Sequence, residues 1–149
     1  MEKAIPIETI VGLIKYRDAI FLDSVESDGY TWSFTGELNG GHITKNSENK
    51  EWVPFKFLFK AVQNVFSCGI ECVPVHLFPQ IEDDGFISCF YRVENSRFLK
   101  NLPVREGISR DSLVHFCLMT YDMAFHIIAE GYELEIPEKA VSPSSSAPI

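Results

Sequence analysis

The stretch WVPFKFLFKAVQNVFSCGIECV, residues 52–73, carries the strongest structural signal in the chain. Within residues 55–59 every second position is phenylalanine, which is the pattern of an extended strand with one buried face. The whole stretch is longer than a usual strand, so we expect a bend or bulge near residues 63–64 or at Gly69, where the chain crosses between sheets. The segment therefore predicts a strongly bent sheet, arranged as a sandwich or a half-barrel.

Strand patterns also occur on both sides of this stretch. Residues 19–26 and 30–38 are separated by Ser-Asp-Gly at 27–29, a turn signal that predicts a hairpin. The polar loop at 39–49 has room for one short edge strand around residues 42–44. Three later strands are expected at residues 86–94, 113–119 and 132–136.

Three segments show helical patterns. Apolar residues recur at helical spacing in residues 6–17 behind Pro6, and Asn95 or Ser96 can cap a short helix that ends at Leu102. Residues 120–131 have Thr120 as a candidate N-cap and Gly131 as a candidate end. The sequence therefore predicts an α+β fold, with a mainly antiparallel, strongly bent sheet and two or three short helices.

Length and composition predict one domain and an acidic surface. Of the 149 residues, we expect 1–137 to form a single globular domain and the Ser/Pro-rich segment 138–149 to be a disordered tail. The chain has 21 acidic and 13 basic side chains, a net charge of −8, which argues against nucleic-acid binding and favours a basic protein partner. The first residues do not resemble a secretory signal, and no apolar run reaches the roughly 18 residues that span a bilayer. We expect a cytoplasmic protein that binds no membrane.

The cysteines are expected to be reduced core thiols. Cys68 and Cys72, with His76, have the outline of a metal clasp, but residues four apart on an extended strand lie about 13 Å apart, too far to share one ion. The sequence also lacks the Gly-rich phosphate loops, the serine elbow and the zinc-binding helix motif of common enzyme classes. We therefore expect no metal, no cofactor and no enzymatic activity.

Two side-chain pairs nevertheless have the residue types that catalysis uses. His115 and Cys117 alternate on one strand, and a histidine beside a thiol is the minimum for a nucleophile. Asp122 and His126 lie four apart on the expected last helix and could form a carboxylate–imidazole pair. Both pairs fit an ordinary core or helix surface better. His115, Cys117 and His126 are kept as the polar members of an alternative apolar pocket. Its walls would be Phe55, Phe57, Phe59, Phe86 and Phe90.

Carboxylates and aromatic side chains are the candidates for partner binding. Two clusters of acids, at residues 23–28 and 82–84, coincide with expected turns. A third cluster differs, because Glu133 and Glu135 alternate on an expected strand and form an acidic stripe beside Glu130. Tyrosine and tryptophan commonly anchor interfaces. The candidate partner-binding residues are Glu130, Tyr132, Glu133, Glu135, Tyr30, Trp32 and Trp52.

These features favour a small acidic protein-binding module, most concretely an immunity- or antitoxin-like inhibitor of a basic partner. The size and acidity are similar to those of cytosolic immunity proteins, a resemblance of profile that no sequence motif carries. Two alternatives remain open. One is a small-molecule-binding protein or enzyme with an apolar pocket, and the other is a structural subunit that forms a homodimer through its aromatic sheet face.

Overall fold

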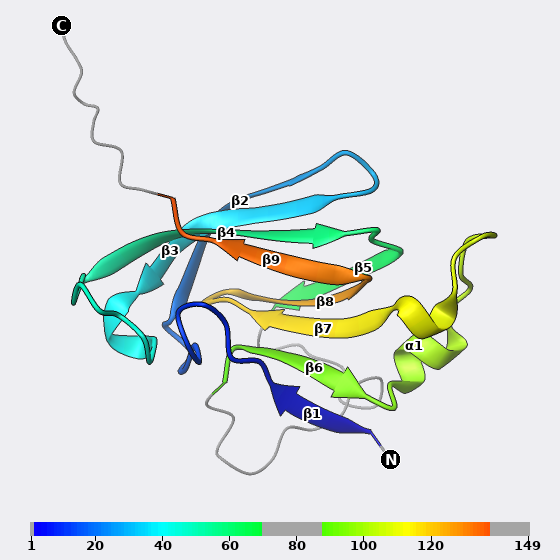
Figure 1. Ribbon diagram of the computed structural model, residues 1–149, viewed down its shortest axis with the longest axis horizontal. Coiled ribbons are helices and arrows are strands. Elements are labelled where there is room, and N and C mark those ends of the chain that lie inside the picture. The colour runs from blue at the N-terminus through cyan, green and yellow to red at the C-terminus, as the bar shows by residue number, and fades with distance from the viewer. Residues whose placement is uncertain (1, 70–87, 138–149) are drawn as a thin grey trace, which may run out of the picture.

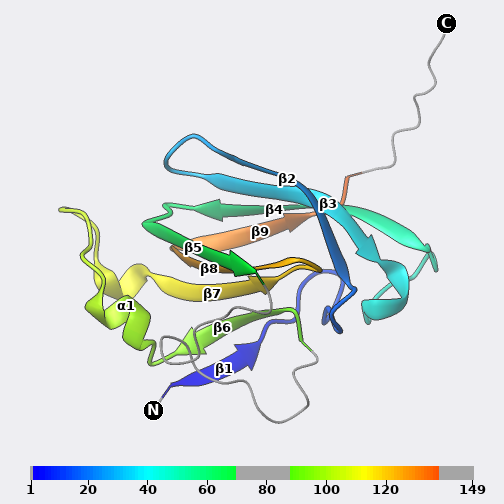
Figure 2. The same ribbon diagram turned by 180° about the vertical axis from the view of Figure 1, so that it is seen from behind.

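A computed structural model describes residues 2–69 and 88–137, which form two antiparallel sheets packed face to face (Figures 1 and 2). The strand order is β1-β6-β7-β8-β5 in the five-stranded sheet and β2-β3-β4-β9 in the four-stranded sheet. The strands are β1 (Lys3–Pro6), β2 (Ile20–Ser27), β3 (Trp32–Asn39), β4 (Trp52–Lys60), β5 (Asn64–Gly69), β6 (Phe90–Glu94), β7 (Val114–Met119), β8 (Met123–Ala129) and β9 (Gly131–Glu135). Short 3-10 helices occupy Gly40–His42 and Arg110–Ser112.

The α+β class expected from the sequence is wrong, because the described residues are mostly antiparallel β-strands and contain one α-helix, α1 (Arg97–Asn101). The helix expected at residues 6–17 does not form. In its place the chain leaves β1 and makes a tight turn in which Thr9 and Gly12 exchange backbone hydrogen bonds of 2.9 and 2.8 Å. Gly12 and Tyr16 both have positive φ, a left-handed conformation that ends a right-handed helix.

The helix expected at residues 120–131 is also wrong. Residues 123–129 form β8, which is antiparallel to both β7 and β5. Thr120 closes the β7–β8 turn, where its Oγ1 lies 3.0 Å from both the backbone N and the backbone O of Met123. Nearly every residue of β8 is buried, so both faces of the strand are covered and its sequence shows no regular alternation of apolar and polar residues.

Other expectations are confirmed at the level of single elements. The hairpin appears as β2 and β3, with Asp28 Oδ1 accepting from the backbone N atoms of Tyr30 and Thr31 at 2.9 and 2.8 Å. The chain bends between β4 and β5, at Ala61 with φ of 54°, and there passes from one sheet to the other. Ser96 caps α1, and β7 and β9 lie where strands were expected. Residues 42–44 contribute only an isolated bridge between Ile14 and Ile43.

Phenylalanine fills the space between the sheets. Phe57 of β4 contacts Phe90 of β6, with ring centroids 4.8 Å apart, and Phe34 of β3 contacts Phe125 of β8 at 5.0 Å. The four phenylalanines of the pocket alternative that the structure describes are part of this core. They are Phe55, Phe57, Phe59 and Phe90, and each is at most 2% exposed.

Several sequence expectations lie outside the described residues, namely the pairing of Cys68 with Cys72 and His76, the acids at 82–84, Phe86 and the tail at 138–149. No helix in the described part of the chain is long and apolar enough to cross a membrane.

Candidate functional site

The three polar candidates of the pocket alternative belong to one chain of buried side chains. His115 on β7 and His126 on β8 meet with His115 Nε2 and His126 Nδ1 2.9 Å apart. At one end, Ser96 Oγ lies 2.7 Å from His115 Nδ1, and at the other, Cys117 Sγ lies 3.9 Å from His126 Nε2. The four side chains are at most 4% exposed, so this chain is part of the packed interior.

Burial sets the protonation states of the His115, His126 and Cys117 side chains. Loss of hydration lowers the pKa of His115 to about 4, and the same effect together with the neighbouring His115 lowers the pKa of His126 to about 3. Burial raises the pKa of the Cys117 thiol to about 12. At neutral pH both imidazoles are uncharged and the thiol is protonated, whereas a cysteine nucleophile must be a thiolate.

The Ser96 hydroxyl has a structural task besides its contact with His115. It accepts a hydrogen bond of 3.0 Å from the backbone N of Leu99, which caps α1 and holds that helix against β7. The pairing expected between Asp122 and His126 depended on a helix. In the structure Asp122 is an exposed turn residue and His126 a buried strand residue.

The acidic stripe on β9 is exposed as expected, but it faces lysines. Lys60 Nζ lies 2.6 Å from Glu133 Oε2, and this contact raises the pKa of Lys60. Glu135 pairs in register with Lys56 of β4, and Glu130 Oε2 lies 3.4 Å from Ser112 Oγ. The charge of Glu133 is therefore balanced by Lys60, which makes this carboxylate a weaker candidate for partner binding.

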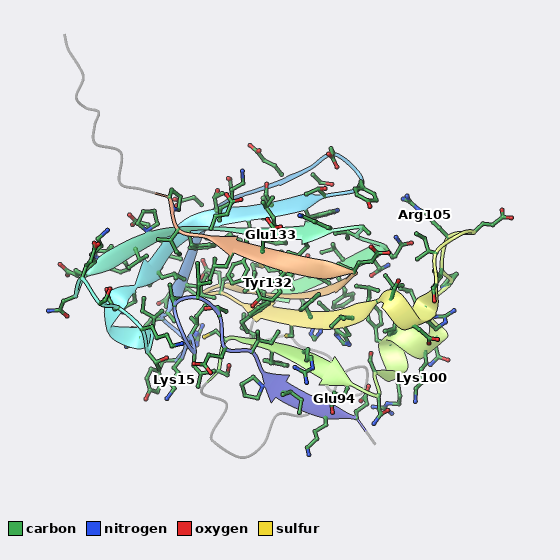
Figure 3. The ribbon with its side chains drawn as sticks, in the orientation of Figure 1. Lys15, Glu94, Lys100, Arg105, Tyr132 and Glu133 are labelled. Atoms are coloured by element: carbon green, nitrogen blue, oxygen red, sulfur yellow. The ribbon has the colours of Figure 1, made fainter. Side chains whose placement is uncertain are left out.

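The four candidate aromatic residues have different environments. Tyr30 is 55% exposed and Trp52 is 42% exposed, so both can reach a partner. Trp32 is half-buried and packs against the core. Tyr132, which Figure 3 labels beside Glu133 on β9, is also half-buried, with its ring centroid 4.9 Å from that of Phe90.

Trp52 belongs to a surface group that sequence patterns did not reveal. The Phe21 ring lies 5.5 Å from Trp52 and stacks on Tyr121 at 5.2 Å. The guanidinium carbon of Arg17 lies 5.5 Å from the centre of the Tyr121 ring, within the range of a cation–π contact. We call Arg17, Phe21, Trp52 and Tyr121 the aromatic cluster. Its tryptophan and tyrosine are 42% and 43% exposed.

Strand register and one backbone hydrogen bond assemble the aromatic cluster. Phe21 pairs with Glu37 and Trp52 with Asn39, so both rings project from the outer face of the four-stranded sheet. Tyr121 comes from the β7–β8 turn of the other sheet, and its backbone N donates to Ile20 O at 2.9 Å. The aromatic cluster therefore lies on the seam between the two sheets.

Carboxylates surround the aromatic cluster. Glu37 is opposite Phe21, Glu51 precedes Trp52 and Asp122 follows Tyr121, and all three are exposed. Across residues 2–69 and 88–137, none of the three forms an ion pair. This surface therefore combines exposed aromatic rings and the cation Arg17 with three carboxylates, which outnumber it.

One local signal points to part of the aromatic cluster. Tyr121-Asp122 separates two apolar runs, as a hairpin turn does, although the pattern also fitted the first turn of a helix. The contact of Tyr121 with Phe21 joins residues from different sheets, and no local pattern encodes it.

The comparisons with known proteins identify no relative. No protein-family model matches the chain, and neither a curated protein nor a solved structure matches it.

Proposed function

We propose that this chain is an acidic protein-binding module that docks a basic partner on the aromatic cluster, most concretely as an immunity- or antitoxin-like inhibitor. The observation that carries the proposal is the exposed contact of Trp52 with Phe21 and of Phe21 with Tyr121, next to carboxylates that form no ion pair within the described residues.

The residue types in the aromatic cluster are those that dominate binding energy at interfaces. Tryptophan, tyrosine and arginine are enriched among interface hot spots, and the two aromatic side chains bury a large area while having few conformations to lose. Here the rings also restrain one another, so these side chains would lose little conformational entropy when a partner binds. This pre-organisation supports binding to a protein surface.

The charge around the aromatic cluster supports a basic partner. Glu37, Glu51 and Asp122 add a local negative potential to a chain whose net charge is −8. Charges at the rim of an interface accelerate association and disfavour partners of like charge. An inhibitor works by occupying the basic surface that its target uses, for example to hold nucleic acid.

Differential capture tests the proposal. The wild-type protein, a Trp52→Ala variant and a Tyr30→Ala variant are immobilised and exposed to lysate of the organism that makes the protein. Trp52 and Tyr30 are both exposed, but only Trp52 lies in the aromatic cluster. We expect a basic protein to bind wild type and Tyr30→Ala and to be lost from Trp52→Ala.

Calorimetry with the purified captured protein then measures the loss. A hot-spot residue contributes roughly 2 kcal/mol or more, so Trp52→Ala should weaken the Kd by about 30-fold. The proposal is wrong if no protein distinguishes Trp52→Ala from the other two, or if the distinguishing protein is acidic.

A further inference from the structure

A hollow of about 490 Å³ opens at the end of the molecule where β6 meets α1, away from the aromatic cluster. Figure 3 shows Glu94 at the end of β6 and Lys100 on α1, both at this end. Three cations and two carboxylates line the hollow, an excess of positive charge on a chain whose net charge is −8. They are Arg92, Lys100, Arg110, Glu94 and Asp111.

Hydrogen bonds to helix α1 hold two of these cations, Arg110 and Lys100, in place. Arg110 Nη1 donates hydrogen bonds of 2.6 and 2.7 Å to the carbonyl oxygens of Leu99 and Leu102, on either side of Lys100. At the other end of α1, Ser96 caps the helix, and its own carbonyl accepts from the backbone N of Lys100 at 3.1 Å. The guanidinium of Arg110 and the backbone of Lys100 are therefore anchored to the same short helix.

Lys100 and Arg110 differ from the third cation of the hollow, Arg92, in their ion pairing. Arg92 is occupied by Glu94, with Nη2 and Oε2 3.1 Å apart. In the described part of the chain neither Lys100 nor Arg110 forms an ion pair, although Asp111 lines the same hollow. Both cations line the same hollow, and a bound anion would offset the repulsion between like charges there.

We propose that this hollow binds a small phosphate monoester, with Lys100 and Arg110 as the groups that hold its phosphate. A phosphate monoester carries between one and two negative charges at pH 7, which matches two cations better than a single carboxylate does. Arginine and lysine are the side chains that most often donate hydrogen bonds to phosphate groups in proteins. A volume of about 490 Å³ also leaves room for the organic part of the molecule. The inference does not depend on the proposed function.

The test is a titration of isotope-labelled protein with inorganic phosphate and then with glycerol 3-phosphate, at constant ionic strength, followed by amide chemical shifts. We expect shifts confined to residues 92–102 and 110–115, the segments that line the hollow, and tighter binding of the monoester. Lys100→Gln should weaken both affinities by roughly tenfold, the value of one hydrogen bond to a charged group. Lys45→Gln is the matched control, because it removes the same charge from a lysine that pairs with Glu8.

Three outcomes would overturn the proposal. The first is the absence of localised shifts with either probe. The second is equal weakening by Lys100→Gln and Lys45→Gln, which indicates general charge attraction. The third is succinate binding as tightly as glycerol 3-phosphate, which makes the hollow a carboxylate site. Lys100 is exposed and its side chain takes no part in the helix cap, so the variant is expected to fold.

Discussion

His115 Nε2 and His126 Nδ1 lie 2.9 Å apart between neighbouring strands, and neither ring reaches solvent to any extent. A neutral imidazole has one N–H, so the contact is a hydrogen bond when one ring donates and the other accepts. The same direction can run through the whole chain, from the Ser96 hydroxyl to His115, then to His126 and on towards Cys117. The arrangement requires uncharged histidines.

The first prediction concerns pH. The pKa values of His115 and His126 are lowered to about 4 and about 3, against 6.5 in the unfolded chain. Between pH 6.5 and 5 these two histidines therefore bind protons in the unfolded state but stay neutral in the folded state. The stabilisation is fully present above pH 6.5 and is lost as pH falls, by up to about 1.4 kcal/mol per pH unit for each histidine. Urea unfolding at several pH values measures the slope.

A free energy of unfolding that is flat between pH 6.5 and 5 would contradict the assignment of neutral buried histidines.

The second prediction concerns the serine that joins α1 to the histidines. Ser96→Ala removes the cap of Leu99 N and leaves His115 Nδ1 without this partner in a buried position. We expect a loss of about 2 kcal/mol in the free energy of unfolding. Ser109→Ala is the matched control, since Ser109 caps an exposed 3-10 helix with a longer contact of 3.3 Å. Equal losses in the two variants would show that the contact with His115 adds nothing.

The third prediction uses two adjacent glycines. A Cβ on Gly40 would lie 1.8 Å from the carbonyl oxygen of Lys50, whereas the nearest atom to a Cβ on Gly41 is Asn39 Oδ1 at 3.4 Å. Gly40→Ala should therefore lower the free energy of unfolding by roughly 2 kcal/mol or more, and Gly41→Ala by less than about 0.5 kcal/mol. Thermal unfolding of both variants decides, and similar melting temperatures would contradict the close approach at Gly40.

The fourth prediction concerns thiol reactivity. Burial raises the pKa of both Cys89 and Cys117 to about 12, so neither should react with iodoacetamide in the native protein at pH 8. Cys68 is partly exposed and should be labelled. Mass spectrometry of peptides from native and urea-unfolded samples measures the difference. Rapid native labelling of Cys117 would instead revive the alternative in which it is a nucleophile.

Strands whose one face is buried could be predicted from the sequence, and strands buried on both faces could not. In β4 only one face is buried, so the phenylalanines on that face alternate with less buried residues on the outer face. This alternation is visible in the local sequence. In β8 both faces are covered, so Ile127 and Ile128 can be adjacent, and that spacing fits a helix as well as a strand. The fold class was wrong chiefly for this reason.

The candidate surface was only partly predictable for a related reason. Trp52 was expected at the surface, and it lies there. The compensation of Glu133 by Lys60 joins residues 73 positions apart, and the stacking of Tyr121 on Phe21 joins two sheets. Both contacts depend on strand pairing, which local patterns do not specify. Trp32 is different, because it alternates with Phe34 and the pattern already places it on the core face.

The pairing of β1 with β6, from Lys3 opposite Glu94 to Pro6 opposite Tyr91, has a consequence for how the chain is made. β1 leaves the ribosome first, and β2, β3, β4 and β5 are all synthesised before its partner exists. The β2–β3–β4 meander can pair at once, but the five-stranded sheet needs β8 and the four-stranded sheet needs β9. Proteins whose strands pair over such long sequence separations fold slowly. The phenylalanines of β4 therefore stay exposed to aggregation in the nascent chain until β8 and β9 have been synthesised.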